Sequence, residues 1–465
     1  MTGDTQAAGP TSVVVFTRDL RLHDNPALAC AAAAAEYVVP LFVHDTRLEA
    51  TGFASAPRSR FLADCLANLD SALRTCGAGL LVRHGDLVTE VCRIAEQTSA
   101  REVHMAADVS AFAQRRQHHL AAALHSQRRV LRLYEEAHTV VAPGRVTPSS
   151  AGADHFAVFT PYLRRWLTAS HRPAATTPRR LRLPPELTPE KAGPNPAAGS
   201  QRWTGGETDG RRRAHQWLTH GIDTYHQRHD DLAADATSHL SPYLHFGCLS
   251  ARDLAADAAG RDTEGAKAFA RQLAWRDFHH QVLAARPNTA HADYRARGDA
   301  WRDDPQALRA WKEGRTGIPI VDAGMRQLAH EGWMHNRARL IVASFLSKTL
   351  YLDWRDGAAH FTDLLLDADL ANNQLNWQWV AGTGTDTRPN RVLNPLRQAE
   401  RYDPTGDYTR RWIPELSAVD NPRDAHQPWR LGDATLRKLT YPAPIVDLAA
   451  ARDHFHHQRQ LALDL

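Results

Sequence analysis

The first 140 residues alternate short apolar runs with longer amphipathic stretches. Five runs rich in β-branched and apolar side chains predict strands at residues 13–17, 37–43, 80–83, 102–105 and 130–134. The intervals at 57–75, 86–97 and 112–125 have the length and spacing of helices. Strands separated by helices of this length predict βαβ units and therefore a parallel sheet.

The pattern changes twice further along the chain. From about residue 142 to 206, Pro, Gly, Ser and Thr dominate, which predicts a long connector, although aromatic residues at 155–166 suggest a short docked helix within it. From about residue 210, apolar residues recur at steps of three and four, and all the tryptophans except Trp166 lie beyond residue 200. This spacing predicts an all-helical second domain. We therefore expect an α/β domain at 11–140, a linker at 141–206 and a helical domain at 207–465.

Composition narrows the class of protein only a little. The chain has 465 residues, which favours two domains, and its hydrophobic fraction of 43% is that of an ordinary globular protein. The net charge is +4, so a nucleic-acid partner would need a local basic patch. The five cysteines form no CxxC pair, which argues against a zinc site or a disulfide framework and fits a reduced cytoplasm. No signal peptide, long apolar span, Walker A motif or G-x-G-x-x-G after the first strand is present.

Polar side chains accompany tryptophan in the helical half, where a plain core would exclude them. Gln272, Trp275 and Arg276 share one helical face, a combination that can stack on a flat ring and hydrogen-bond to its edge. Taken alone, this segment favours the simpler interpretation of an exposed polar face with one half-buried tryptophan.

A second cluster surrounds residue 336. Trp333, Asn336 and Leu340 are expected on one helical face, with Arg337 and Arg339 pointing elsewhere. The helix should therefore have one side on a core and one on a ligand. The neighbouring His335 is interpreted as a structural residue, because most single helical histidines are.

The third cluster is the densest. Asp367 and Asp369 precede three asparagines and two tryptophans, with Asn373 and Trp377 as i,i+4 neighbours. Nothing supplies further metal ligands, so a heterocycle bound through its polar edge fits better than a metal. Upstream, the run TSHLSP at 237–242 opens a helical stretch and predicts either a phosphate site or an ordinary helix cap.

Together these segments resemble the photolyase/cryptochrome family over essentially the whole chain. The matching segments, in the family's order, are RDLRLHDNPAL, FTPYLRRW, TSHLSP, WRDF, GIPIVDAGMRQL, GWMHNRAR, DWRDG and ANNQLNWQW. The resemblance is strongest to class I cyclobutane-dimer photolyases of the actinobacterial type, which also suits the excess of Arg over Lys. It implies a Rossmann-like N-terminal domain that binds an antenna pigment, and an all-α C-terminal domain that binds FAD.

The resemblance further implies light-driven repair of cyclobutane pyrimidine dimers in DNA, by electron transfer from reduced FAD to a flipped-out dimer. It implies roles at positions that match the family's motifs. The FAD-binding positions are Tyr225, Thr237, Ser238, His239, Leu240, Ser241, Arg339, Asp367, Asp369 and Asn373. The catalytic positions are Gln272, Asn336 and Asn373. The positions that contact the dimer or DNA are Gln272, Trp275, Arg276, Asn336, Arg337, Trp379, Arg391 and Gln398. The electron-transfer tryptophans are Trp301, Trp354 and Trp377.

One position departs from the family's common pattern, since most dimer photolyases have Glu where this chain has Gln272. Glutamine keeps a hydrogen-bond donor but cannot deliver a proton. A (6-4) photolyase, where Gln is usual, is the nearest enzyme alternative, but Leu340 stands where its second pocket histidine would fall. A cryptochrome photoreceptor is the alternative from another class, and the presence of the dimer-contacting residues counts against it.

The antenna and the assembly are also implied by the resemblance. Family members use methenyltetrahydrofolate or 8-hydroxy-5-deazaflavin. Folate-type members carry an Asn-Glu pair after the fourth strand, whereas this chain reads Ala106-Ala107-Asp108 there, which favours deazaflavin. We expect a monomer in the cytoplasm, associated with the nucleoid through DNA and not with a membrane.

Overall fold

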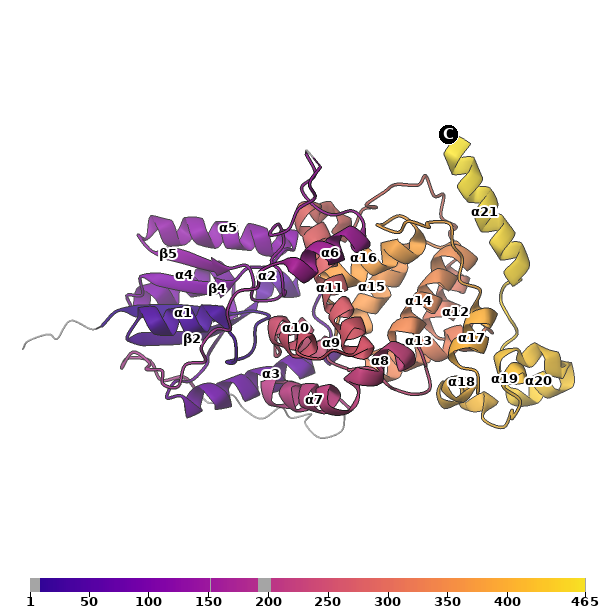
Figure 1. Ribbon diagram of the computed structural model, residues 1–465, viewed down its shortest axis with the longest axis horizontal. Helices are drawn as coiled ribbons and strands as arrows, with labels where there is room; N and C mark the ends of the chain where they lie inside the picture. The colour runs from indigo at the N-terminus through magenta and orange to yellow at the C-terminus, as the bar shows by residue number, and fades with distance from the viewer. Residues whose placement is uncertain (1–8, 151, 191–201, 465) are drawn as a thin grey trace, which may run out of the picture. The chain divides into compact units, whose positions relative to one another are not determined.

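The computed structural model describes residues 9–150, 152–190 and 202–464 (Figure 1). The chain divides into two compact units. The first, called the sheet unit, comprises Met1–Phe156, Tyr162–Ile222 and Ser238–Pro287. The second, called the helical unit, comprises Ala157–Pro161, Asp223–Thr237 and Asn288–Leu465.

The sheet unit contains all five strands found in the described residues. The strands are β1 (Thr11–Phe16), β2 (Tyr37–Asp45), β3 (Leu81–Gly85), β4 (Glu102–Ala106) and β5 (Val130–Tyr134). The helices between and after them are α1 (Pro26–Ala34), α2 (Thr46–Glu49), α3 (Ala56–Thr75), α4 (Leu87–Gln97), α5 (Ala111–Ser126), most of α6 (Phe159–Thr168), α7 (Glu207–His220), α9 (Ser241–His245), α10 (Ala251–Ala259) and α11 (Glu264–Ala285).

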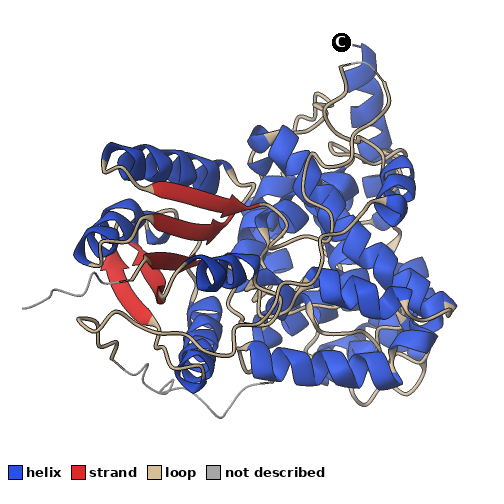
Figure 2. Ribbon diagram, turned by 60° about the vertical axis from the view of Figure 1, so that its left-hand side comes forward, coloured by secondary structure: helices blue, strands red, loops and turns tan. Residues whose placement is uncertain are grey.

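The strands form one parallel sheet in the order β3-β2-β1-β4-β5, with helices on both faces (Figure 2). In the central strand β1, Val13 pairs with Val39 on one side and with Val103 on the other. All three valines are fully buried, as expected for a parallel strand covered on both faces. The five predicted strands and the parallel sheet are confirmed.

Helix α1 was not predicted, because its run of alanines has no amphipathic period. The chain nevertheless carries a start signal for it. Asn25 accepts a hydrogen bond from the Leu28 backbone N–H, and Pro26 occupies the first helical turn. The helix is therefore specified by its cap and by small buried residues on the sheet, not by a polar and an apolar face.

The connector after the sheet is tied to α11 by a buried carboxylate. Asp277 Oδ2 accepts hydrogen bonds from the backbone N–H groups of Val140 and Val141 and from Trp166 Nε1, each at 2.9 Å. Burial raises the pKa of Asp277. The short helix expected at 155–166 forms slightly later, as α6, and the KAGPNPAAGS run lies outside the described residues.

Every regular element found in the described residues of the helical unit is a helix, as predicted for this half of the chain. Its α-helices are α8 (Tyr225–Arg228), α12 (Pro305–Lys312), α13 (Pro319–Glu331), α14 (Asn336–Ser344), α15 (Trp354–Leu364), α16 (Leu370–Ala381), α17 (Pro395–Tyr402), α18 (Asp407–Trp412), α19 (Pro422–His426), α20 (Asp433–Leu439) and α21 (Leu448–Asp464). A π-helical turn, Phe345–Thr349, follows α14 directly. Among the described residues, no helix is both long and apolar enough to cross a membrane.

Candidate functional site

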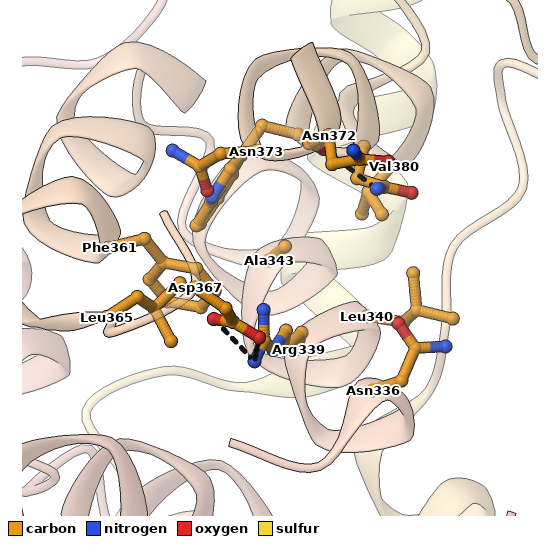
Figure 3. A pocket seen from close by; sticks show the side chains of 12 residues that line it. Asn336, Arg339, Leu340, Ala343, Phe361, Leu365, Asp367, Asn372, Asn373 and Val380 are labelled. Carbon is orange, nitrogen blue, oxygen red and sulfur yellow. Dashed lines mark hydrogen bonds and ion pairs between the residues drawn. The ribbon is translucent and has the colours of Figure 1, made fainter. Parts of the chain in front are cut away.

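A pocket in the helical unit lies between α14, α15 and α16 (Figure 3). Helices α14 and α16 contribute polar side chains to it, and Phe361 of α15 forms part of its apolar wall. The residues that line it are Asn336, Arg339, Leu340, Ala343, Phe361, Leu365, Asp367, Asn372, Asn373, Asn376, Trp377 and Val380. The polar cluster around residue 336 and the cluster that begins at Asp367 therefore line the same pocket.

An ion pair between Arg339 and Asp367 is the main charged feature of this pocket (Figure 3). Arg339 Nη2 donates to both carboxylate oxygens, at 3.0 and 2.8 Å, and Arg339 Nε donates to the Met334 carbonyl at 2.9 Å. The Asp367 side chain is only 4% exposed. Charge-assisted hydrogen bonds of this kind fix the guanidinium and the carboxylate in place, so both reach the pocket in a defined orientation.

The two acidic residues of this segment have different tasks. Asp369 caps α16, because its Oδ1 accepts hydrogen bonds from the backbone N–H of Asn372 at 3.0 Å and from Asn372 Nδ2 at 2.8 Å. Asp369 N in turn donates to the Asp367 carbonyl at 2.7 Å. The cap thus sets where α16 begins and which of its residues face the pocket.

The amide of Asn373 is oriented by α15. Its Nδ2 donates to the Ala358 carbonyl at 3.0 Å and to Thr362 Oγ1 at 3.1 Å. Since the nitrogen is committed to these acceptors, the amide oxygen turns away from α15. Asn373 therefore offers the pocket a fixed hydrogen-bond acceptor.

The helical face predicted around residue 336 needs two corrections. Helix α13 ends at Glu331 and is capped by Gly332, whose φ of +62° favours glycine. Because α14 begins only at Asn336, Trp333 lies buried in the connector and shares no helical face with Asn336. His335 is the N-cap, and its Nδ1 accepts a hydrogen bond from the Arg337 N–H at 3.1 Å. The prediction that Arg339 points elsewhere is wrong, because spacings of three and four put it on the face of Asn336 and Leu340.

Trp377 and Trp354, two of the three tryptophans singled out for electron transfer, are buried within the helical unit. Trp377 packs edge-to-face on Phe361 with ring centroids 5.0 Å apart. Trp354 opens α15, and its Nε1 donates to Asp293 Oδ1 at 2.8 Å. One turn later, Gly357 packs directly on Trp377, since a Cβ there would lie 2.2 Å from Trp377 Cη2. Because Gly357 has no side chain, α15 and α16 can approach each other closely at this point.

The predicted dimer-contacting residues of the sheet unit lie on α11. Gln272 is exposed, and Trp275 is half-buried with its ring 5.5 Å from that of Phe278. The Arg276 guanidinium donates to the carbonyls of His138 and Leu244. Gln272 and Trp275 are therefore accessible, whereas the charge of Arg276 is largely used within the sheet unit.

The candidate phosphate segment falls across the boundary of the two units. Tyr225 and Thr237 belong to the helical unit, where the Tyr225 and His229 rings lie 5.0 Å apart and burial raises the pKa of Tyr225. Ser238, His239, Leu240 and Ser241 belong to the sheet unit. There the backbone N–H of Leu240 donates to Ser238 Oγ at 3.4 Å, and α9 begins at Ser241 as the sequence predicted.

The remaining candidate DNA-contacting residues differ in their exposure and in the contacts they make within the protein. Arg337 donates to both oxygens of Asp230, at 3.1 and 2.7 Å, and stacks on the Tyr402 ring. Arg391 is exposed, while Trp379 and Gln398 are half-buried.

A buried lysine holds the segment that carries Arg391. Lys348 Nζ donates to the carbonyls of Pro389 at 2.7 Å and Arg391 at 2.8 Å. Burial lowers the pKa of Lys348 to about 7. The lysine thus fixes this segment through backbone contacts alone.

Six pocket residues were not assigned a role from the sequence. Four of them follow helical spacing from predicted residues, and that spacing could have indicated them: Ala343, Asn372, Asn376 and Val380. No sequence pattern near Phe361 and Leu365 indicates a ligand site, because only the packing of α15 against α16 brings them to the pocket. Among the described residues, no group of three or more His, Cys, Asp or Glu side chains could hold a metal ion.

Two family comparisons agree with this architecture. Residues 12–180 match the family described as DNA photolyase, and residues 269–460 match the family described as FAD binding domain of DNA photolyase. The chain therefore belongs to the photolyase/cryptochrome family, whose members pair an α/β domain with a helical FAD-binding domain.

Individual relatives extend over nearly the whole chain. A deoxyribodipyrimidine photo-lyase of Streptomyces griseus is 54% identical over 455 residues, covering 97% of this chain and 99% of that protein. A class III photolyase structure from Agrobacterium tumefaciens has a TM-score of 0.91 at 31% identity, with all of both chains covered. An archaeal photolyase from Sulfolobus tokodaii, solved with two FAD molecules, has a TM-score of 0.85 at 29% identity, covering 97% of this chain and 100% of that one.

Proposed function

We propose that this chain is a deoxyribodipyrimidine photo-lyase, an enzyme that splits cyclobutane pyrimidine dimers in DNA with blue or near-ultraviolet light. One observation carries the proposal: the Arg339–Asp367 pair and the oriented Asn373 amide converge in one pocket of the FAD-binding region. When bound, reduced FAD supplies the light-driven electron chemistry, and the repair cycle has no net redox change.

The pocket residues fit a flavin ring by their chemistry. A flat heterocycle needs apolar contacts for its faces and a few fixed polar groups for its edge. Phe361 and Leu365 supply apolar surface, while Arg339, Asp367 and Asn373 supply a cation, an anion and a neutral amide. We assign Arg339 and Asp367 to flank the flavin ring. Asp369 is assigned to the polar edge of the ring, and Asn373 to its N5 nitrogen.

The rest of the cofactor is assigned to the candidate phosphate segment. Hydroxyl and backbone N–H groups near a helix start are suited to phosphates. The residues proposed for this role are Tyr225, Thr237, Ser238, His239, Leu240 and Ser241.

We assign recognition of the flipped-out dimer to aromatic and amide side chains. Trp275 and Trp379 supply stacking surface, and Gln272 and Asn336 supply hydrogen bonds to the dimer carbonyls. A dimer stacks poorly within DNA, so extruding it costs less than extruding a normal base. Pocket fit then gives lesion specificity.

Arg276, Arg337, Arg391 and Gln398 are assigned to the DNA backbone. Arg391 is exposed, whereas Arg276 and Arg337 are engaged within the protein. Because each phosphate contact adds to the salt dependence of binding, Arg391→Ala should reduce the slope of log K against log salt more than Arg337→Ala does.

Trp377, Trp354 and Trp301 are assigned as the path by which electrons reach oxidised flavin from the surface. The burial of Trp377 and Trp354 supports this role, together with the half-buried position of Trp301. The path restores the reduced cofactor and is separate from the repair step.

An antenna pigment is proposed for the sheet unit. In open α/β sheets, ligands bind beyond the carboxyl ends of the strands where the strand order reverses, which here lies beside β1 and β4. Arg18 follows β1 and pairs with Asp108, which follows β4, at 3.0 Å. Burial would raise the pKa of Asp108, but Arg18 and His138 outweigh it and hold the pKa well below its usual range. We favour 8-hydroxy-5-deazaflavin over methenyltetrahydrofolate, and an absorbance spectrum of the purified protein tests this choice.

The finer assignments belong to the same proposal. We retain class I membership of actinobacterial type, although a class III photolyase shares the fold, because the fold does not distinguish the classes. The domain boundaries 11–140, 141–206 and 207–465, a monomeric state and a cytoplasmic location are retained as well. Neither a cryptochrome nor a (6-4) photolyase is favoured, and Leu340 in the pocket lacks the acid–base chemistry of a second histidine.

The direct test illuminates the purified, flavin-reduced protein with an oligonucleotide that contains one thymine dimer. Restored thymine absorbance under blue light, with none in the dark, is the expected result. A protein that purifies without flavin, or that leaves the dimer intact while repairing a (6-4) photoproduct, contradicts the proposal.

A further inference from the structure

Two neighbouring strands of the sheet unit, β4 and β5, place four polar side chains on one face of the sheet. In the register of this parallel pair, His104 of β4 lies opposite Arg132 of β5. Side chains two residues apart along a strand share a face, so Glu102 lies on the face of His104, and Tyr134 on the face of Arg132. Helix α1 packs on both strands, and the Cys30 that it carries meets Tyr134.

The four side chains form a continuous series of polar contacts. Arg132 donates to Glu102 Oε1 from Nε at 3.1 Å and from Nη2 at 2.7 Å. The other carboxylate oxygen, Glu102 Oε2, lies 3.4 Å from His104 Nε2. On the opposite side of the imidazole, His104 Nδ1 lies 2.7 Å from Tyr134 Oη. The guanidinium therefore holds the carboxylate, the carboxylate faces one ring nitrogen, and the phenol faces the other.

The Cys30 thiol is the outer end of this series. Burial raises the pKa of Tyr134, and a hydrogen bond with the Cys30 thiol raises it further. The phenol is therefore protonated at neutral pH. A hydroxyl group that contacts both a thiol and an imidazole can accept a proton from the first while it donates its own to the second.

His104 has the properties of a base in this arrangement. Its side chain is only 2% exposed. Burial lowers the pKa of His104, and the nearby Glu102 offsets this only in part, so the imidazole is neutral at neutral pH. Because Nε2 faces a carboxylate, the ring proton is assigned to Nε2, which leaves Nδ1 as the acceptor of the phenol hydrogen.

The position of Cys30 makes its sulfur accessible to small molecules. All five cysteines lie among the described residues, and only Cys30 is exposed. The residues one turn away from it along α1 are alanines and a proline, so no large side chain of the same helix shields the thiol. By contrast, burial raises the pKa of the thiols of Cys76 and Cys92. Cys30 alone combines exposure with a contact to a proton acceptor network.

We propose that Cys30 is a reactive thiol that forms a reversible mixed disulfide with small disulfides, activated by proton transfer through Tyr134 to His104. The thiol proton passes to Tyr134 Oη as the phenol proton passes to His104 Nδ1. The resulting thiolate attacks one sulfur of a low-molecular-weight disulfide. A new S–S bond forms, the old one breaks, and the departing thiolate takes up the proton that the imidazolium releases. The Cys30 sulfur is oxidised, the departing sulfur is reduced, and a small thiol reverses the exchange.

The phenol and the imidazole supply the thiolate near neutral pH. Exchange begins with the thiolate, because the protonated thiol is a poor nucleophile. A positioned base speeds removal of the thiol proton, and the Tyr134 hydroxyl then donates a hydrogen bond to the charged sulfur. Glu102 stabilises the imidazolium of the buried His104, and Arg132 holds that carboxylate in place. All these residues belong to the sheet unit, so the inference does not depend on the proposed function.

The test measures thiol exchange in the full-length protein with two probes, an aromatic nitrobenzoate disulfide and glutathione disulfide. Peptide mass spectrometry locates the modified cysteine. At pH 7, we expect Cys30 to react roughly tenfold or more faster than Cys92, and dithiothreitol to remove the modification. Tyr134→Phe keeps the ring but interrupts proton transfer, so it should slow the reaction of Cys30 several-fold at pH 7. At pH about 10, where an ordinary thiol ionises without help, this difference should disappear.

The matched control is Tyr37→Phe, because Tyr37 is also half-buried at a strand end of this sheet but lies on β2, which is adjacent to neither β4 nor β5. This variant should exchange at the wild-type rate. Cys30→Ser should remove the fast reaction and leave light-driven repair unchanged.

Three results overturn the inference. The first is a Cys30 rate at pH 7 that is the same in wild type and Tyr134→Phe. The second is a slowing that persists undiminished at high pH, since that indicates a steric effect and not lost proton transfer. The third is modification that spreads evenly over Cys30 and Cys92. Should Tyr134→Phe fail to fold, as judged by circular dichroism, His104→Gln replaces it, and an unchanged rate in that variant overturns the inference equally.

Discussion

Arg339 holds both carboxylate oxygens of Asp367 through a single guanidinium nitrogen, at 3.0 and 2.8 Å, within the pocket between α14, α15 and α16. The pair brings one positive and one negative group to the proposed flavin ring while leaving the local net charge near zero. Each charge is costly to leave alone in a partly buried site, so the two are expected to act as a unit.

Removing one member of this pair should release the cofactor. Arg339→Leu leaves Asp367 without its partner, and we expect a loss of roughly 2–3 kcal/mol in stability with a drop of roughly tenfold or more in flavin affinity. The flavin-to-protein absorbance ratio after gel filtration measures this. Arg326→Leu is the control, because Arg326 pairs with Glu415 at 2.7 Å and its side chain is about as exposed as that of Arg339, but it does not line the pocket. Equal flavin loss in both variants would mean that general instability, not the pocket, releases the cofactor.

Asn373 should govern the stability of the reduced state. Asn373→Leu removes the oriented amide and leaves the Ala358 carbonyl without this donor, at a cost of about 1–3 kcal/mol. We expect the variant to retain flavin but to reoxidise several-fold faster in air, as followed by absorbance. Gln374→Leu provides the comparison, since Gln374 lies on the same helix but does not line the pocket. Identical reoxidation rates in the two variants would show that Asn373 does not influence the flavin.

Gly357 should be required for the placement of Trp377. Gly357→Ala puts a methyl group 2.2 Å from Trp377 Cη2, so the indole or the helix must shift, at a cost of about 1–3 kcal/mol. We expect light-driven flavin reduction to fall strongly, while repair by pre-reduced enzyme is largely kept. Gly260→Ala is the control, because the nearest atom to its added Cβ lies at 3.6 Å. Normal photoreduction in Gly357→Ala would show that Trp377 tolerates displacement.

Lys348 should make stability depend on pH. Its pKa is near 7 in the folded protein and near 10.5 when unfolded, so between these values the unfolded chain binds more protons. Stability should therefore rise with pH from about 7, at up to about 1.4 kcal/mol per pH unit. Urea unfolding at pH 7 and pH 8.5 measures the slope, and Lys348→Met should flatten it. A slope that is the same in both proteins would assign the effect to other groups.

Gln272 should support repair through hydrogen bonding alone. Gln272→Glu restores a carboxyl group. Because hydrogen bonding alone supports repair in this hypothesis, we expect similar lesion binding and a similar quantum yield of repair. The yield is measured with a single-dimer oligonucleotide under calibrated light. A much higher yield in the variant, at unchanged binding, would show that the wild type lacks a useful proton donor.

The sequence predicted most of the regular structure because the periodicity was clear. The β-branched runs of the first half gave five strands at nearly the observed bounds, and the spacing of apolar residues gave the helical half. It missed α1, whose alanines have no period, and it extended the face of α14 back to Trp333. That error arose because His335 and Gly332, a cap and a left-handed turn, interrupt a pattern that looks continuous in the sequence.

The order of the motifs determined the class of protein. The cluster of Asp367 and Asp369 with asparagines and tryptophans indicated a heterocycle bound through its polar edge, because nothing nearby supplies further metal ligands. Only the tertiary structure decided that Arg339 faces the pocket, that Asn373 is turned by α15 and that Gly357 admits Trp377. It alone brought Tyr134 against His104 and Cys30. These relations join residues far apart in the chain, and their geometry depends on how whole helices pack, which no local pattern encodes.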